Sequence, residues 1–341
     1  MNKLSAIPAL FALLLLFPPQ YAGAEDLHGD EGDACPRTEK LKRTVEFLSS
    51  KELGGRGRGT SGHAEAAFYL AERFRQMGLK PISGRYSQSF RFGEEQSCGH
   101  NIMGLFCAPG TSQNRRYIII GAHYDHLGTI NGKVYPGADS NASGVVGMLE
   151  VARLMCGLAD EGKRFYNSVI FIAFDASLDG MEGSAAFWRD LNEGRFRDPV
   201  SDKVILPSNV CLMADLDQIG SSRAPVHKNR RDYLITLGEE SLPGSRRGLL
   251  GECNRNCGLD LDLCFSYYGS EGFTKMFYRL GDRRNFIDHG IPTLLFTSGI
   301  TDLNNKPRDN YKMLDYEIFS KRITLIFNYI KTLTTTSWQK G

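Results

Sequence analysis

Short, continuously apolar segments alternate with longer segments that carry apolar residues at helical spacing, and this alternation limits the possible folds. The apolar runs have the length of buried strands: "YIIIGA", "SVIFIA", "NVCLMA", "YLITLG" and "PTLLFT". Helical spacing is found over residues 61–77, 142–155 and 315–333. Buried strands that alternate with such helices are typical of a parallel sheet covered on both faces. The sequence predicts one α/β domain over residues 41–335, with a mostly parallel central sheet flanked by helices on both faces.

Residues 1–24 have the features of a secretory signal peptide. Lys3 supplies a positive charge, and the apolar run over residues 9–17 is too short to span a bilayer. "AGA" before Glu25 is a small-residue cleavage pattern, so we predict removal after residue 24. An uncleaved membrane anchor is the alternative. Residues 25–40 are predicted to be flexible, and no later segment is predicted to span a membrane. We therefore expect an exported protein, periplasmic or extracellular.

The net charge limits the classes of binding partner, and the cysteines bear on the cellular compartment. A formal net charge of +2 without a basic block argues against a nucleic-acid partner. All eight cysteines follow the predicted cleavage point, where export permits disulfides. Cys253, Cys257 and Cys264 have a spacing that suits either a metal cluster or a local disulfide, and export favours the disulfide.

Polar residues gather where the predicted strands end. His123 and Asp125 follow one strand, Asp139 lies in a glycine-rich loop before a helix, and Asp215 and Asp217 end another strand. Ligands of parallel sheets bind at the carboxyl ends of the strands. One histidine with several carboxylates suits zinc or a similar ion, and Asp125 is placed to orient the imidazole of His123.

Several motifs together resemble metallopeptidase family twenty-eight, the two-zinc aminopeptidases of the bacterial leucyl aminopeptidase type. The resemblance rests on "IIIGAHYDHLG", "GADSNASGVVGMLEVARLM", "DLDQIG", "FIDHGIPTLLF" and "KPRDNYKMLDYE", and it extends over nearly the whole mature chain. It implies a zinc aminopeptidase-like fold. It also implies that His123, Asp139 and Asp217 hold one metal, with Asp139 bridging to a second.

The same resemblance implies that the second metal site has lost its own ligands. Ser177 stands where the family has its general-base glutamate, and Leu178 where it has a glutamate ligand. Asn305 replaces the histidine ligand, and Asn304 replaces a tyrosine that polarises the substrate. Arg283 occupies a position where histidine is usual. We expect at most one tightly bound zinc ion and no catalytic residue at position 177.

Two nearby acids offer a way to restore the lost carboxylate. Asp179 lies one residue beyond Leu178 and is the candidate displaced ligand, and Glu182 lies in the same turn. The alternative is that both acids simply stabilise the start of the helix that follows.

These observations predict an exported protein with the fold of a zinc aminopeptidase, impaired hydrolysis, and a cleft that binds a peptide or the free amino terminus of a protein. The alternative is an active metalloaminopeptidase with altered metal coordination. Glutaminyl cyclases share the fold, but their zinc ligands resemble those of the lost site. A fold kept only for protein contacts is a further alternative.

Overall fold

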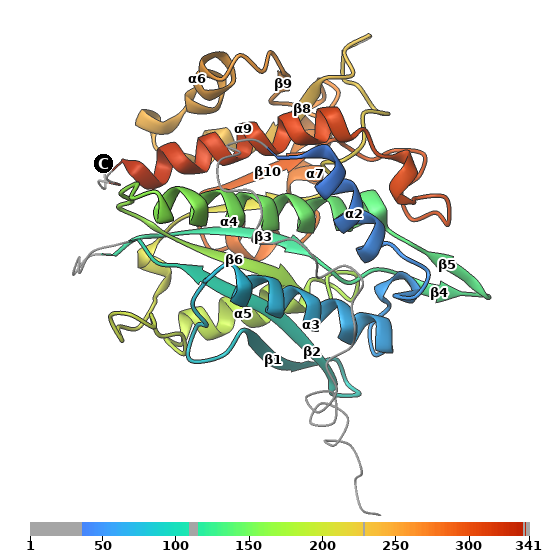
Figure 1. The fold of residues 1–341 in the computed structure, drawn as a ribbon, viewed down its shortest axis with the longest axis horizontal. Helices are drawn as coiled ribbons and strands as arrows, with labels where there is room; N and C mark the ends of the chain where they lie inside the picture. Colours follow the sequence, from blue (N-terminus) through green and yellow to red (C-terminus); the bar gives the residue numbers. More distant parts are fainter. Residues whose placement is uncertain (1–35, 109–114, 228, 337, 339–341) are drawn as a thin grey trace, which may run out of the picture. The chain divides into compact units, whose positions relative to one another are not determined.

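The computed structural model describes residues 36–108, 115–227, 229–336 and 338. The compact unit that holds the central sheet runs from Cys35 to Gly341 (Figure 1). The predicted signal peptide, and residues 25–35 of the segment predicted to be flexible, lie outside the described residues.

An eight-stranded sheet is the centre of this unit, with the strand order β1-β2-β6-β3-β7-β10-β8-β9. A separate two-stranded hairpin, β4–β5, extends beside it (Figure 1). The strands are β1 (Ser87–Phe92), β2 (Ser97–Phe106), β3 (Tyr117–His123), β4 (Gly128–Ile130), β5 (Lys133–Tyr135), β6 (Ser168–Phe174), β7 (Val210–Leu216), β8 (Tyr233–Leu237), β9 (Asp262–Cys264) and β10 (Thr293–Thr297).

The central strands run in one direction and the outer ones do not. β6, β3, β7 and β10 are parallel neighbours, while β2 joins β6 and β8 joins β10 in antiparallel pairs. The outermost strands pair as the β1–β2 antiparallel hairpin and as the parallel β8–β9 pair. The predicted α/β fold with a largely parallel central sheet is confirmed, and the carboxyl ends of its central strands meet at one edge.

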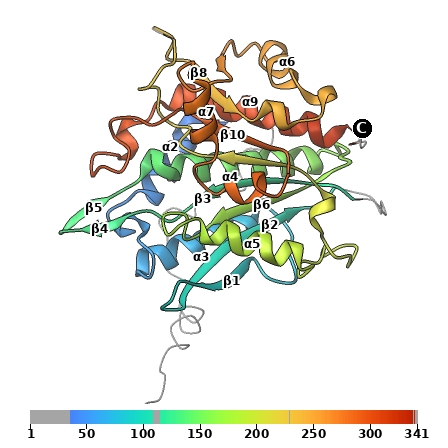
Figure 2. The same ribbon diagram turned by 180° about the vertical axis from the view of Figure 1, so that it is seen from behind.

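Helices cover both faces of the sheet (Figures 1 and 2). Side chains of α2, α3, α4 and α9 form one hydrophobic core with the sheet, and side chains of α5 and α8 form a second core on the opposite face. The α-helices are α2 (Thr38–Leu48), α3 (Ser61–Gln76), α4 (Gly144–Asp160), α5 (Glu182–Asn192), α6 (Leu249–Asn256), α7 (Glu271–Tyr278), α8 (Arg284–Ile287) and α9 (Tyr316–Thr335).

The alternation of side chains along β3 explains its continuous apolar sequence. Ile118 and Ile120 belong to the core under α4 and α9, whereas Ile119 belongs to the core under α5. Both faces of the strand are therefore buried, and every position must be apolar.

Helix α4 and the turn before it, residues 138–160, have the length and hydropathy of a membrane span, which the sequence prediction did not identify. In the most apolar 18-residue stretch of this segment, 72% of the residues are buried inside the protein. Val145, Leu149, Ala152 and Met155 all point into the core, as predicted. The apolar character of α4 is thus that of a core helix.

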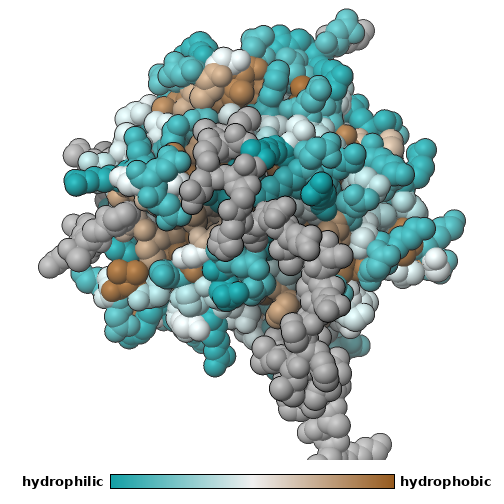
Figure 3. All heavy atoms as spheres, in the orientation of Figure 1, coloured by the Kyte–Doolittle hydropathy of each residue, from teal (hydrophilic) through white to brown (hydrophobic). Residues whose placement is uncertain are grey.

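The outer elements differ more from the prediction than the central ones. Helix α2 begins at Thr38, inside the segment predicted to be flexible, because Leu41, Val45 and Leu48 pack into the core. On the face drawn in Figure 3, hydrophilic residues predominate, with smaller hydrophobic patches between them.

Candidate active site

His123 and Asp217 lie at the ends of neighbouring parallel strands, and this brings their side chains together. His123 is the last residue of β3, and Asp217 directly follows β7. The His123 Nε2 atom is 3.9 Å from Asp217 Oδ1. The other ring nitrogen, Nδ1, lies 3.1 Å from the backbone oxygen of Asp125 and 3.6 Å from its Oδ1. Nε2 therefore faces Asp217, while Asp125 holds the opposite side of the ring.

The acids around His123 favour its charged form. Burial lowers the pKa of His123, but the hydrogen bond and charge of Asp125, together with the charges of Asp217 and Asp282, raise this pKa to about 9. Without a metal, the imidazole therefore carries a proton at neutral pH. A metal ligand must be neutral, so an ion bound here must displace that proton.

Asp139 lies in the turn before α4, and the two oxygens of its side chain differ. Oδ1 accepts hydrogen bonds from the Gly220 backbone N at 2.9 Å and from the Ser143 hydroxyl at 3.1 Å. Oδ2 is buried and has no hydrogen-bond partner. Burial and the nearby charge of Asp309 raise the pKa of Asp139 to about 7. A buried carboxylate oxygen without a partner is costly, and a cation would satisfy it.

Arg283 brings a positive charge of the protein itself into the site. Its side chain is fully buried, and Nη1 donates to Asp215 Oδ2 at 2.7 Å and lies 3.4 Å from Asp217 Oδ2. The remaining guanidinium nitrogens donate to the backbone oxygens of Tyr278 and Phe277. The arginine is therefore held in place by the backbone and neutralises carboxylates at the end of β7.

Asp282 is a site residue that the sequence did not identify. It is buried, and its Oδ1 accepts a hydrogen bond from the Ser184 hydroxyl at 2.6 Å. Burial raises the pKa of Asp282 to about 6, although nearby His123 and hydrogen bonds from Ser184 and Ser177 oppose this shift. Asp282 thus lies beside Ser177, the residue that occupies the position of the missing general base. Its only signal in the sequence is its place next to Arg283.

The positions of the lost ligands carry no metal-binding side chain. Leu178 is 44% exposed, and its backbone N donates to Asp125 Oδ2 at 3.2 Å. Asn305 is exposed. Asp179, the candidate displaced ligand, is paired with Arg58 at 2.7 Å, and both side chains are about one-third exposed. Glu182 is the first residue of α5.

The donor chemistry fits one cation better than two. His123 and Asp217 face each other, and Asp139 has an unused oxygen. Within the described ranges, however, a group of three ligand atoms within 4.8 Å of one another occurs elsewhere and not here. Asp139 can join His123 and Asp217 only if its free oxygen turns toward them. The predicted metal role of these three residues therefore stays a prediction, and so does the expected loss of the second metal.

Structural comparison defines the class of the fold. The LapA aminopeptidase of Legionella pneumophila is 17% identical, with a TM-score of 0.65 over 88% of this chain and 72% of that chain. BSAP, a zinc aminopeptidase from Bacillus subtilis, is 14% identical, with a TM-score of 0.65 over 90% of this chain and 97% of that chain. A glutaminyl cyclase of Porphyromonas gingivalis is 16% identical, with a TM-score of 0.64 over 89% of this chain and 100% of that chain. The chain has the fold of these enzymes.

The sequence itself assigns the family. The profile of peptidase family M28 matches residues 101–330, which is more than half of the chain. The chain belongs to peptidase family M28, so the predicted resemblance is confirmed. A search of curated proteins finds no match. Because the family and a structural neighbour include zinc aminopeptidases, zinc is the metal they suggest.

Proposed function

We propose that this protein is an exported member of peptidase family M28 that binds peptide amino termini and hydrolyses them far more slowly than an active aminopeptidase. The observation that carries this proposal is the replacement of the general base and of the second metal's ligands by Ser177, Leu178 and Asn305. Loss of a general base slows a reaction by about 10²–10⁴-fold. Loss of a co-catalytic metal removes transition-state stabilisation of several kcal/mol.

The charge of the site supports binding of a free amino terminus. Asp217 remains partly exposed, with 18% of its side chain accessible. An ammonium group is a cation that such a carboxylate attracts. Arg283 and, in the metal-free protein, the charged imidazole of His123 already neutralise part of the acidic charge around Asp217, so the proposed interaction is weakened and suits reversible binding.

Exposed apolar side chains border the same loops and suit the first side chain of a peptide. Leu178 is 44% exposed, Leu280 50% and Ile300 42%. Leu178 is hydrogen-bonded to Asp125, and Leu280 is two residues from Asp282. Exposed apolar groups beside a few polar groups are common at ligand sites.

The proposed metal content of the site at the ends of β3 and β7 is at most one zinc ion, held by His123 and Asp217 with Asp139 as the third ligand. When bound, zinc would supply Lewis-acid chemistry at this site. The protein's own groups hold the His123 ring through Asp125 and balance the charge of Asp217 through Arg283.

An active metalloaminopeptidase is the second candidate, and one observation favours it. Asp282 places a buried carboxylate, with its pKa raised to about 6 chiefly by burial, beside Ser177. A carboxylate with a raised pKa is suited to general-base catalysis near neutral pH. In this alternative, Asp282 takes over the role of the missing glutamate.

One experiment separates the two candidates. The mature protein is assayed with aminoacyl reporter substrates, with and without added zinc or cobalt, alongside His123→Ala and Asp282→Asn. We expect no turnover, or a residual rate that neither variant changes. A rate of about 1–10³ per second that both variants abolish would establish the active enzyme instead. Titration calorimetry with a short peptide and its N-acetylated form tests recognition of the amino terminus.

A further inference from the structure

A second group of metal-ligating side chains lies at the edge strand β9, away from the site at the ends of β3 and β7. His227, Asp262 and Cys264 place one ligand atom each within 4.8 Å of the others. In the sheet, β10 and β8 separate β9 from β7. The family resemblance assigned no role to these three residues. We propose that His227, Asp262 and Cys264 form a zinc site.

The local structure explains why the three side chains meet. Asp262 and Cys264 are the first and last residues of β9, so they are two positions apart and project to the same side of the strand. β9 pairs in parallel with β8, which fixes its position. His227 comes from the loop before β8, and its neighbour Val226 packs against the hydrophobic cluster that contains Cys264. The loop that carries His227 is therefore held against the same hydrophobic cluster that contains Cys264.

The distances are close to those of a zinc site that lacks its ion. His227 Nδ1 is 2.5 Å from Asp262 Oδ2 and 3.9 Å from Cys264 Sγ. Around a tetrahedral zinc, bonds of about 2.0 Å to nitrogen and oxygen and about 2.3 Å to sulfur place the ligand atoms about 3.3–3.5 Å apart. The short contact between His227 and Asp262 is a hydrogen bond, and an ion would replace its proton. Small movements of side chains are enough to admit the metal.

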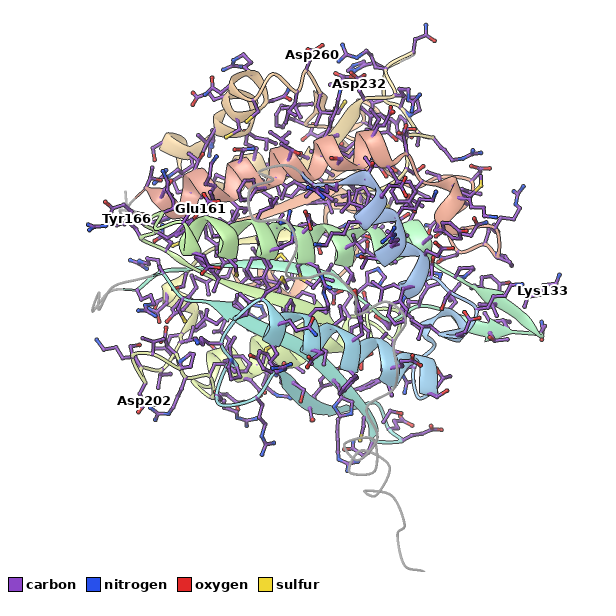
Figure 4. All side chains as sticks on the ribbon, viewed as in Figure 1. Lys133, Glu161, Tyr166, Asp202, Asp232 and Asp260 are labelled. Carbon is purple, nitrogen blue, oxygen red and sulfur yellow. The ribbon has the colours of Figure 1, made fainter. Side chains whose placement is uncertain are left out.

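The surrounding charges leave this carboxylate available. The neighbouring acids Asp232 and Asp260 lie at the same end of the molecule (Figure 4). Arg230 lies 2.9 Å from Asp232 and 4.0 Å from Asp260. The carboxylate of Asp262 instead accepts its hydrogen bond from His227. Arg230 thus pairs with the flanking acids, while the carboxylate of Asp262 has His227 as its hydrogen-bond partner.

The donor set selects for zinc. A cysteine sulfur and an imidazole favour zinc over calcium or magnesium, which prefer oxygen ligands. The His227 side chain is 63% exposed, so solvent can reach the site and a water can complete four-coordination. Zinc binds the thiolate form of cysteine, so the Cys264 thiol must lose its proton when the ion binds.

The structure also separates Cys264 from the two cysteines that precede it in the sequence. Cys253 is buried in α6 with its Sγ 3.8 Å from Thr332 Oγ1, while Cys257 ends the helix and is exposed. None of these three cysteines forms a disulfide in the structure, so the local disulfide expected from their spacing is not observed. Cys264 meets a histidine and an aspartate instead of the other cysteines.

Cobalt(II) substitution of the reduced mature protein tests the site, because a cobalt–thiolate bond has a charge-transfer band that carboxylate and imidazole ligands do not produce. The experiment is carried out in the His123→Ala variant. This substitution removes one predicted ligand of the other metal site, at the ends of β3 and β7. We expect one equivalent of Co²⁺ to give the thiolate band, and zinc to displace it. Cys264→Ser should abolish the band. His227→Ala, which removes an exposed side chain, should weaken the binding of cobalt and of zinc by more than about tenfold.

Two matched variants control for non-specific effects. Cys257→Ser removes an exposed cysteine close in sequence, and His289→Ala removes an exposed histidine on another element. Both should leave the band and the affinity unchanged, and circular dichroism should show that all variants are folded. Absence of a thiolate band, its survival in Cys264→Ser, or its loss in Cys257→Ser would overturn the proposal.

Discussion

Arg283 holds a positive charge beside Asp215 and Asp217 at the end of β7, and its removal should be costly. Arg283→Met would leave the buried Asp215 and the partly exposed Asp217 without their cation. We expect it to lower the free energy of unfolding by about 3–5 kcal/mol in metal-free protein, as for other broken buried ion pairs. Urea denaturation measures this change.

The exposed Arg279, which pairs with Asp288, is the matched control for this prediction. Arg279→Met should change stability by less than about 1 kcal/mol, because solvent screens a surface pair. Adding Asp215→Asn to Arg283→Met should recover part of the loss. Equal effects of Arg283→Met and Arg279→Met would contradict the structural role of Arg283.

A second prediction at the residue scale concerns the positions where the general base and the ligands of the second metal are replaced. Ser177→Glu, Leu178→Glu and Asn305→His together should raise the zinc content of the His227→Ala background from at most one ion toward two. Elemental analysis of the dialysed protein measures the content. Asp179→Ala should leave it unchanged, since Asp179 is paired with Arg58. A fall in zinc content caused by Asp179→Ala would show that this residue is the displaced ligand after all.

At the scale of elements, Asp198 joins the loop after α5 to the start of β3. Its carboxylate accepts from Arg115 Nη1 at 2.9 Å, from the Tyr117 hydroxyl at 2.7 Å and from backbone N atoms of the loop. Burial alone would raise the pKa of Asp198, but the hydrogen bonds from Tyr117 and the backbone, with the charge of Arg115, hold it below its ordinary value. The stabilisation is therefore present above the unfolded pKa of about 3.9 and disappears as the pH falls through the lower folded pKa.

Asp198→Asn should thus destabilise the protein at pH 7 by about 3–5 kcal/mol, because Arg115 loses a buried partner. The difference from the natural protein should persist at pH 5 and shrink only near pH 3 and below. Urea denaturation at these pH values tests it. Asp202→Asn, in the same loop but with an 88% exposed side chain, is the control and should have little effect. A penalty that already disappears between pH 7 and pH 5 would contradict the lowered pKa.

The elements also show how far the sequence could predict this fold. β3, β6 and β7 were predictable because both of their faces are buried and their sequences are apolar throughout. The β1–β2 hairpin was missed because β1 alternates buried and exposed residues over only six positions. β9 has three residues, too few for a recognisable period.

Side-chain contacts at the site were less predictable than its position. His123 and Asp217 could be placed together because parallel strands bring their carboxyl ends to one edge. Arg283 and Asp282 come from the turn before α8, and only the packing of that turn against β7 and α5 decides what they contact. The group of His227 with Cys264 likewise depends on tertiary packing.

At the scale of the whole molecule, two separate zinc sites would add to stability independently. A ligand that binds only the folded state at 100 times its dissociation constant stabilises it by about 2.7 kcal/mol. Zinc should therefore raise the thermal midpoint of the natural protein, and a chelator should reverse the effect. His123→Ala and His227→Ala should each remove a different part of this increase, and the double variant should remove all of it. A zinc-induced increase that survives in the double variant would place the binding elsewhere.

The guanidinium of Arg283 is part of the polypeptide. Its positive charge is therefore always present and does not depend on binding an ion from the surroundings. A zinc enzyme of this fold depends on metal supply to balance the acids at its strand ends. Here Asp215 keeps a cation at 2.7 Å whatever the environment contains. A protein built in this way can keep this part of its shape where zinc is scarce. The peptide recognition proposed for this protein would then not depend on a supply of the ion.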